Sequence, residues 1–176
     1  EVQKQLATLA EHVQRVKPVL DQLKPEEWVQ QGAPAVYADQ LRYRADDPHW
    51  DGRDRFLLST GHYAIGLYAA LAEAGIVPEA ELDTYGSDGS RLPMSGMASY
   101  TPGMEISGGS LGHGLTVAVG MALGLRHQGN GARVINFLSD GELDEGSTWE
   151  AAMGASHHAL SNLIATRQIE IGDVVC

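Results

Sequence analysis

The chain has 176 residues, 43% of them hydrophobic and 20% charged, which is the composition of about one globular domain with a core of its own. The formal net charge of −11 argues against nucleic acid as the main partner, because phosphate backbones are held by an excess of Lys and Arg. No apolar run is long enough to span a membrane, and the single cysteine, Cys176, excludes an internal disulfide framework. We therefore expect a cytoplasmic protein without a membrane segment, and the lack of an initiating Met suggests a fragment.

The first 34 residues predict a helical segment. Apolar side chains recur there at steps of three and four, which places them on one helical face: Leu6, Leu9, Val13, Val16, Leu20 and Leu23. A coiled coil is the alternative interpretation, but the stripe is shorter than three heptads and Pro18 interrupts it, which favours packing on the parent fold. We expect residues 1–34 to form this segment and residues 35–176 to form an α/β domain.

A short strand is predicted at Phe56 to Leu58, after a stretch of aspartates and glycine that reads as turns. A helix is expected directly after Gly61 and His62, because apolar residues follow at helical spacing, and Gly75 suits its C-terminal cap. His62 therefore lies at a strand-to-helix junction. A histidine in that place is either a hydrogen-bonded structural residue or one that faces a ligand.

Residues 83–103 predict a loop, because glycines, serines and prolines interrupt them. A glycine cluster follows at residues 108–114, and a helix with one buried face, ended by Gly129, is expected after it. The cluster resembles a dinucleotide fingerprint, but Val117 stands where a third small residue belongs, and no acidic residue ends a following strand. The remaining interpretations are a glycine loop that approaches a ligand closely and a glycine turn that leads into a packed helix.

The stretch from Arg133 to Glu150 carries the main chemical signal. It predicts a buried strand from Val134 to Leu138, an acidic loop, and a helix that starts at a capping box formed by Ser147 and Glu150. In an open parallel sheet, ligands bind beyond the carboxyl ends of the strands, and a helix N-terminus attracts anions. Carboxylates in this loop would repel a bare phosphate, so a diphosphate would need a divalent cation such as Mg²⁺ between them.

A calcium-binding EF-hand is excluded for the same loop. Asp140, Glu142 and Asp144 alternate correctly, but Glu145 replaces the required glycine and Ala151 replaces the bidentate glutamate. His157 and His158 are adjacent on the expected helix and point about 100° apart, so they cannot chelate one metal together.

The segment SDGELDEG, followed by WEAAMGASHH and LSNLIA, resembles the diphosphate-binding motif of thiamine diphosphate enzymes in the form that transketolases carry. The upstream segments DPHWDGRDRFLLSTGHYAIGLYAALAEAG, TPGMEISGGSLGHGL and AVGMALGL resemble consecutive transketolase segments in the family order. The similarity covers roughly residues 41 to 165. It implies the α/β thiamine diphosphate-binding fold, a parallel sheet flanked by helices.

The resemblance also implies roles for residues around the acidic loop and the glycine cluster. Asp140 is expected to bind the metal, Mg²⁺ or Ca²⁺, and Gly141 to present its backbone N–H to the diphosphate. Glu142 is expected to contact the cofactor, and Gly109 and Leu111 to lie beside its aminopyrimidine ring.

Three further residues are expected to take part in catalysis. By resemblance His62 contacts both the cofactor and the substrate and handles protons near the reacting carbon. Glu145 and Glu150 match acidic positions that in transketolases lie at the interface between subunits and link two cofactor sites. The alternative for these glutamates is a solvated helix start.

The sequence departs from the transketolase pattern at several positions. Residues 30–41, QQGAPAVYADQL, contain no counterpart of a family histidine that faces the substrate, and Ser95 in SRLPMSGM stands where a second one belongs. Ser139 replaces a glycine, and no Asn follows Asn162 to serve as a second metal ligand, because Glu170 occupies about that register. These differences weaken the expectation of an ordinary sugar phosphate donor.

The implied function is that of the diphosphate-binding half of a split transketolase-like enzyme. The glutamate that activates the cofactor lies in a pyrimidine-binding domain in this family, so we expect a separate pyrimidine-domain chain as partner and a homo-oligomer of such pairs. The substrates would be small sugars or keto compounds, with a two-carbon ketol unit passed from a ketose to an aldehyde. Transfer from a 2-oxo acid or to a carrier-bound acceptor remains an alternative, as does a catalytically inactive partner chain.

Overall fold

The computed structural model describes residues 41–167, which belong to one compact unit. The helical segment expected over residues 1–34, its boundary at residue 35 and the register of Glu170 lie outside the described residues.

The described chain forms a parallel three-stranded sheet in the order β1-β2-β3. Its strands are β1 (Arg55–Leu58), β2 (Val134–Leu138) and β3 (Leu163–Arg167). All five residues of β2 are buried, because this strand is paired on both edges and covered on its faces. The strands expected at residues 56–58 and 134–138 are confirmed, whereas β3 was not expected as a strand from the sequence.

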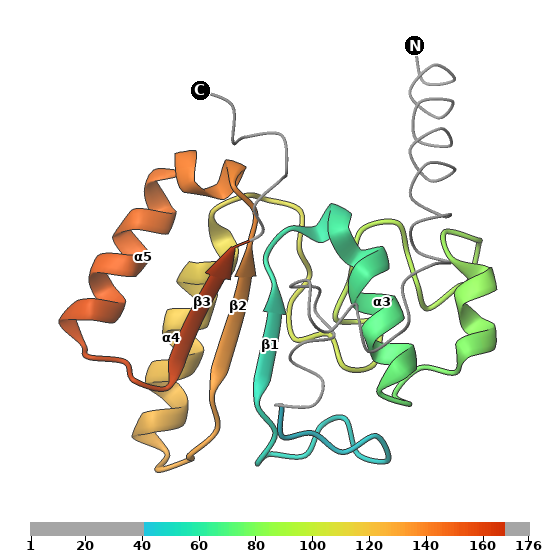
Figure 1. Cartoon of the computed structure of the whole chain (residues 1–176), viewed down its shortest axis with the longest axis horizontal. Helices are drawn as coiled ribbons and strands as arrows, with labels where there is room; N and C mark the ends of the chain where they lie inside the picture. Colours follow the sequence, from blue (N-terminus) through green and yellow to red (C-terminus); the bar gives the residue numbers. More distant parts are fainter. Residues whose placement is uncertain (1–40, 168–176) are drawn as a thin grey trace, which may run out of the picture. The chain divides into compact units, whose positions relative to one another are not determined.

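Within residues 41–167, three α-helices and three 3₁₀ turns connect and cover the strands. They are η2 (Gly61–Tyr63), α3 (Ala64–Glu73), η3 (Glu79–Thr84), α4 (His113–His127), η4 (Gly141–Asp144) and α5 (Gly146–His157). Helices α4 and α5 lie on the β3 side of the molecule and α3 lies on the β1 side (Figure 1). This is the predicted α/β arrangement, a parallel sheet flanked by helices.

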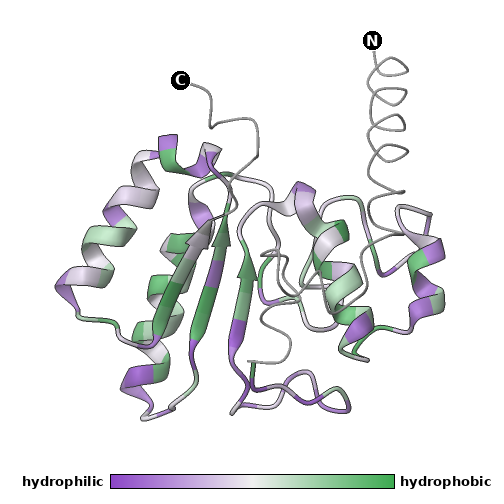
Figure 2. Ribbon diagram, in the orientation of Figure 1, coloured by the Kyte–Doolittle hydropathy of each residue, from purple (hydrophilic) through white to green (hydrophobic). Residues whose placement is uncertain are grey.

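The core lies between the sheet and α4. Figure 2 shows that the strands and much of α4 are hydrophobic. The buried residues of this core come from two strands, one helix and the adjoining loops: Leu57, Ala118, Ala122, Leu125, Ala132, Val134 and Leu160. The two fully buried alanines of α4 allow this helix to lie close against the strands, because they add little bulk between the two backbones. None of the helices within residues 41–167 is long and apolar enough to cross a membrane.

Glycines end two helices where the sequence predicts them. Gly75 follows α3 with φ +70°, and Gly129 follows α4 with φ +68°, a conformation that costs other residues energy. The predicted capping box of α5 is wrong. The helix begins at Gly146, with Glu145 at the N-cap, and the Ser147 hydroxyl donates to the backbone oxygen of Gly112 instead.

A buried carboxylate anchors the amino ends of β1 and β2. The Asp54 side chain is fully buried and accepts hydrogen bonds from the guanidinium and backbone groups of both Arg42 and Arg133. Burial raises the pKa of the Asp54 carboxyl, but these hydrogen bonds outweigh that effect and lower the pKa to about 2. The ion pair therefore joins the chain segments that precede the two strands.

This pairing predicts a stability that decreases in acid. The pKa of Asp54 is lowered from 3.8 to about 2 on folding. The contribution of this carboxylate to the free energy of unfolding is therefore complete above about pH 5 and is lost as the pH falls toward 2. The shift corresponds to about 2 kcal/mol, of which about 1 kcal/mol is lost by pH 3. Urea denaturation of wild type and Asp54→Asn at pH 6 and pH 3 should show a smaller difference between the two proteins at pH 3. The exposed Asp88→Asn serves as control, and a difference independent of pH would contradict the prediction.

Candidate functional site

Polar segments follow β1 and β2 at the carboxyl edge of the sheet. Residues 59–62 follow β1 and residues 139–141 follow β2, and the parallel pairing brings both to the same edge. The backbone N–H of Ser59 extends the pairing by donating to the oxygen of Phe137 at 3.1 Å. The start of α4 reaches the same edge, since the Gly114 N–H donates to Ser59 Oγ at 3.1 Å.

The Glu142 carboxylate is the centre of this edge. Its side chain is completely buried, and each of its two oxygens accepts two hydrogen bonds. Oε1 accepts from the Ser59 hydroxyl and, at 3.1 Å, from the backbone N–H of Gly112. Oε2 accepts from the Thr60 hydroxyl and from the backbone N–H of Ser139, both at 3.0 Å. A buried carboxylate needs such donors, because burial removes the water that would solvate its charge.

Three glycine-containing segments pack backbone to backbone beside His62. The Gly96 N–H donates to the Gly61 oxygen and the Gly108 N–H donates to the Gly96 oxygen, both at 3.2 Å. A Cβ on Gly61 would lie 2.6 Å from the backbone carbon of Gly108 and 2.7 Å from Ser95 Oγ. Gly61 and Gly108 exclude any larger residue, because a Cβ on either one has no space between the two backbones.

The start of α4 is packed just as closely. Gly112 has φ +78°, and a Cβ there would lie 2.8 Å from Cβ of Glu145. A Cβ on Gly114 would overlap the Ser59 side chain. At Gly112 and Gly114 the structure therefore agrees with the interpretation of a glycine turn that leads into a packed helix. The interpretation of a glycine loop that approaches a ligand stays a prediction.

The residues expected beside the cofactor ring and substrate surround this packed region. His62 is exposed, directly follows Gly61, and stacks edge-on against Tyr63 with ring centroids 4.5 Å apart. Gly109 is exposed with φ +144°, and Leu111 is half-buried immediately before Gly112. Ser95, also exposed, donates a long hydrogen bond of 3.4 Å to the Gly108 oxygen, so its hydroxyl lies next to both glycine segments.

Asp140 and Gly141 offer the groups that a metal diphosphate requires. The half-buried Asp140 carboxylate accepts the Gly141 N–H at 2.8 Å through Oδ1, and Oδ2 has no bond of its own within the described residues. A Cβ on Gly141 would meet nothing within 4 Å, so there is open space above this backbone. Residues 41–167 contain no group of three His, Cys, Asp or Glu that could hold a metal. One carboxylate suits Mg²⁺, which keeps waters and takes phosphate oxygens as its other ligands.

Glu142 itself, in contrast, faces inward. The sequence predicted that it contacts the cofactor, and the structure accounts for both of its oxygens with hydrogen bonds inside the chain. Glu145 and Glu150 are exposed at the start of α5, and neither side chain caps the helix. They are therefore free to meet another chain or the solvent.

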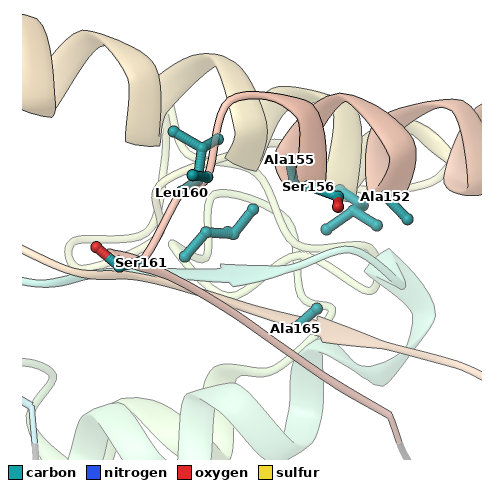
Figure 3. A pocket seen from close by; sticks show the side chains of 9 residues that line it. Ala152, Ala155, Ser156, Leu160, Ser161 and Ala165 are labelled. Atoms are coloured by element: carbon teal, nitrogen blue, oxygen red, sulfur yellow. The ribbon is translucent and has the colours of Figure 1, made fainter.

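A separate open groove of about 570 Å³ lies between α4, α5 and β3 (Figure 3). Small apolar and hydroxyl side chains line it, among them Ala152, Ser156 and Ala165. Its lining contains no ionisable residue, so it does not suit a phosphate or a metal ion.

Sequence reasoning missed the contacts that hold the site together, which are made by Ser59, Thr60 and Ser147. Each is a small hydroxyl residue whose bond crosses between segments far apart in the chain. One signal could have found the first two, because hydroxyl residues directly after a buried strand lie at the edge where ligands bind.

These features define the class of the protein. A parallel sheet with an acidic loop, an open glycine backbone and a glycine-rich helix start at one edge is typical of α/β domains that bind phosphate-bearing ligands. The sequence matches the family model described as "Transketolase, thiamine diphosphate binding domain" over residues 29–170. The chain belongs to the transketolase family.

Individual relatives agree with the family. An uncharacterized transketolase family protein of Sinorhizobium fredii is 70% identical over 129 residues, which cover 73% of this chain and 46% of the relative. One of the subunits of apulose-4-phosphate transketolase from Actinobacillus succinogenes is 47% identical over 112 residues, 64% of this chain and 41% of the relative. The structure of transketolase from Leishmania mexicana superposes with a TM-score of 0.72 at 33% identity, covering 76% of this chain and 22% of that one. The chain thus spans less than half the length of these curated relatives.

Close packing at the start of α4 predicts opposite effects for two glycines of one helix. Gly114→Ala should destabilise by about 1–3 kcal/mol, because the added methyl group overlaps Ser59. Gly120→Ala should stabilise by up to about 1 kcal/mol, because it meets nothing within 4 Å and alanine favours the helix. Urea denaturation measures both, and a Gly114→Ala variant as stable as Gly120→Ala would contradict the described packing.

Proposed function

We propose that the chain is the diphosphate-binding half of a thiamine diphosphate-dependent, transketolase-like enzyme. It would transfer a two-carbon ketol unit from a ketose donor to an aldehyde acceptor. The observation that carries this proposal is the convergence of the segments containing His62, Leu111 and Asp140 on one buried carboxylate at the carboxyl edge of the sheet. The family membership and the names of the relatives support it.

In this proposal each exposed residue has a separate task. Asp140 holds Mg²⁺, or Ca²⁺, against the diphosphate, while the open backbone at Gly141 admits the phosphate oxygens. Gly109 and Leu111 lie beside the aminopyrimidine ring. His62 binds the substrate oxygen and moves its proton. Thiamine diphosphate supplies the carbanion chemistry that cleaves and forms the carbon–carbon bond.

A partner chain completes the enzyme in this proposal. The relative from Actinobacillus is named as one subunit of its transketolase, which supports a division of the enzyme into two chains. We propose that a pyrimidine-domain chain binds beside the described edge and that pairs of the two chains associate further. The exposed Glu145 and Glu150 at the start of α5 are the residues proposed to link neighbouring cofactor sites.

Cofactor binding tests the proposal directly. Asp140→Asn should weaken binding of thiamine diphosphate with Mg²⁺ by about tenfold or more, because it removes the negative charge that holds the metal. Isothermal titration of the enzyme purified with its partner measures this dissociation constant. Asp144→Asn, an exposed carboxylate in the same loop, should bind as wild type does. Equal affinities for wild type and Asp140→Asn would refute the metal site.

Measuring turnover with different donor substrates distinguishes a ketose donor from a 2-oxo acid donor. With apulose 4-phosphate, xylulose 5-phosphate and pyruvate as donors, activity on a ketose phosphate is expected, whereas activity on pyruvate alone would favour a 2-oxo acid donor. His62→Ala should reduce kcat by about 100-fold or more, because it removes a positioned proton-transfer group. His127→Ala, an exposed histidine at the far end of α4, is the matched control. If no donor is turned over while the cofactor binds, the chain is not an active transferase half.

A further inference from the structure

Glu142 differs from the other acidic residues of the site because it is fully buried, and it has no cationic partner among the described residues. Its negative charge is held by two hydroxyls and two backbone N–H groups. Gly112 is also the N-cap of α4, so the carboxylate lies at the positive end of a 15-residue helix. The charge is therefore stabilised by dipoles alone, and each dipole belongs to a different position in the chain.

Each of its donors lies next to a segment with a proposed ligand-binding role. Thr60 precedes Gly61 and His62, Gly112 directly follows Leu111, and Ser139 directly precedes Asp140. Through Ser59 the same carboxylate also fixes the Gly114 N–H. One side chain thus sets the relative positions of three loops, and its bond to Thr60 alone spans 82 residues of sequence.

The carboxylate is unable to meet a ligand without losing these bonds. It is 0% exposed, and both oxygens already accept two donors each. An amide in its place fails for a simple reason. One of the two atoms would be an NH₂ group facing a hydroxyl and a backbone N–H. The hydroxyl can turn and accept a hydrogen bond from the NH₂ group, but the backbone N–H cannot, so one hydrogen bond would be replaced by repulsion between two donors.

We infer that Glu142 is a positioning residue, which organises the cofactor site by joining its three loops and does not touch the cofactor itself. This inference rests on the proposed function. It separates Glu142 from Asp140, two residues away, whose carboxylate is half-buried and open to a metal. The inference also explains why a charged side chain is buried at this edge of the sheet. If the residue served packing alone, an apolar side chain would fill the space at a lower cost in free energy.

A second buried carboxylate provides a matched control. The Asp54 side chain is also fully buried, but it anchors the opposite, amino ends of the same two strands. Glu142→Gln and Asp54→Asn should both lower the stability of the fold. Only Glu142→Gln should weaken binding of thiamine diphosphate with Mg²⁺, by about tenfold or more, whereas Asp54→Asn should stay within roughly threefold of wild type. The titrations are made on the enzyme with its partner, well below the melting temperature of each variant.

Amide hydrogen exchange of the chain without cofactor gives a second readout. In Glu142→Gln, exchange should rise in residues 59–63, 110–115 and 139–142, while in Asp54→Asn it should rise near residues 131–134. If Glu142→Gln does not fold, Ser59→Ala, which removes a single donor to the carboxylate, is judged by the same criteria.

The outcomes separate the inference from the proposed function. Weaker cofactor binding in Glu142→Gln alone supports the inference. Unchanged binding in this variant, or an equal loss in Asp54→Asn, overturns the inference and leaves the proposed function standing. A wild-type enzyme that binds no thiamine diphosphate overturns the proposed function, and the inference with it.

Discussion

A carboxylate that leaves water must find hydrogen-bond donors inside the protein, and Glu142 imposes this requirement on the whole carboxyl edge of the sheet. Its four donors come from the ends of β1 and β2 and from the start of α4. No one of these segments determines its own position, because each is a loop or helix end that lacks the regular backbone pairing of a strand or helix interior. Their common acceptor fixes them relative to one another.

The two ends of the β1–β2 pair use charge in different ways. At the amino ends, Asp54 is neutralised by Arg42 and Arg133, which forms a closed structural ion pair. At the carboxyl ends, Asp140 and Glu142 have no such cations among the described residues, so no side chain there neutralises their negative charge. Carboxylates therefore form a closed ion pair at one end of the strands and leave an acidic edge at the other, where we propose the metal site.

Glycine has a comparable double role at this edge. Gly61, Gly108 and Gly114 are required by close contact between segments, because a Cβ would overlap a neighbouring backbone or side chain. Gly141 has open space above it, so packing does not explain this glycine, and in the proposed function a diphosphate approaches its backbone. The absence of a side chain thus reflects packing at three positions and leaves open space at a fourth.

Much of this could be predicted from the sequence. Local patterns identified the strands at residues 56–58 and 134–138, the helices that follow them and the glycines that end α3 and α4, because hydrophobic spacing and backbone freedom are properties of short segments. The motif around Asp140 identified the family. The local signals failed at α5, where a serine expected to cap its own helix bonds to a distant loop, and at β3, which had no distinctive pattern before it paired with β2.

The sequence by itself thus determined the element types, the family and the residues that reach the edge of the sheet. Only the tertiary structure decided which carboxylate of the acidic loop is open and which is buried. Asp140 and Glu142 are two residues apart in one acidic loop and look alike in sequence, yet one is open and the other is enclosed by hydroxyl and backbone donors. That difference depends on Ser59, Thr60 and Gly112, which are 30 or more residues away and meet the loop only when the parallel strands pair.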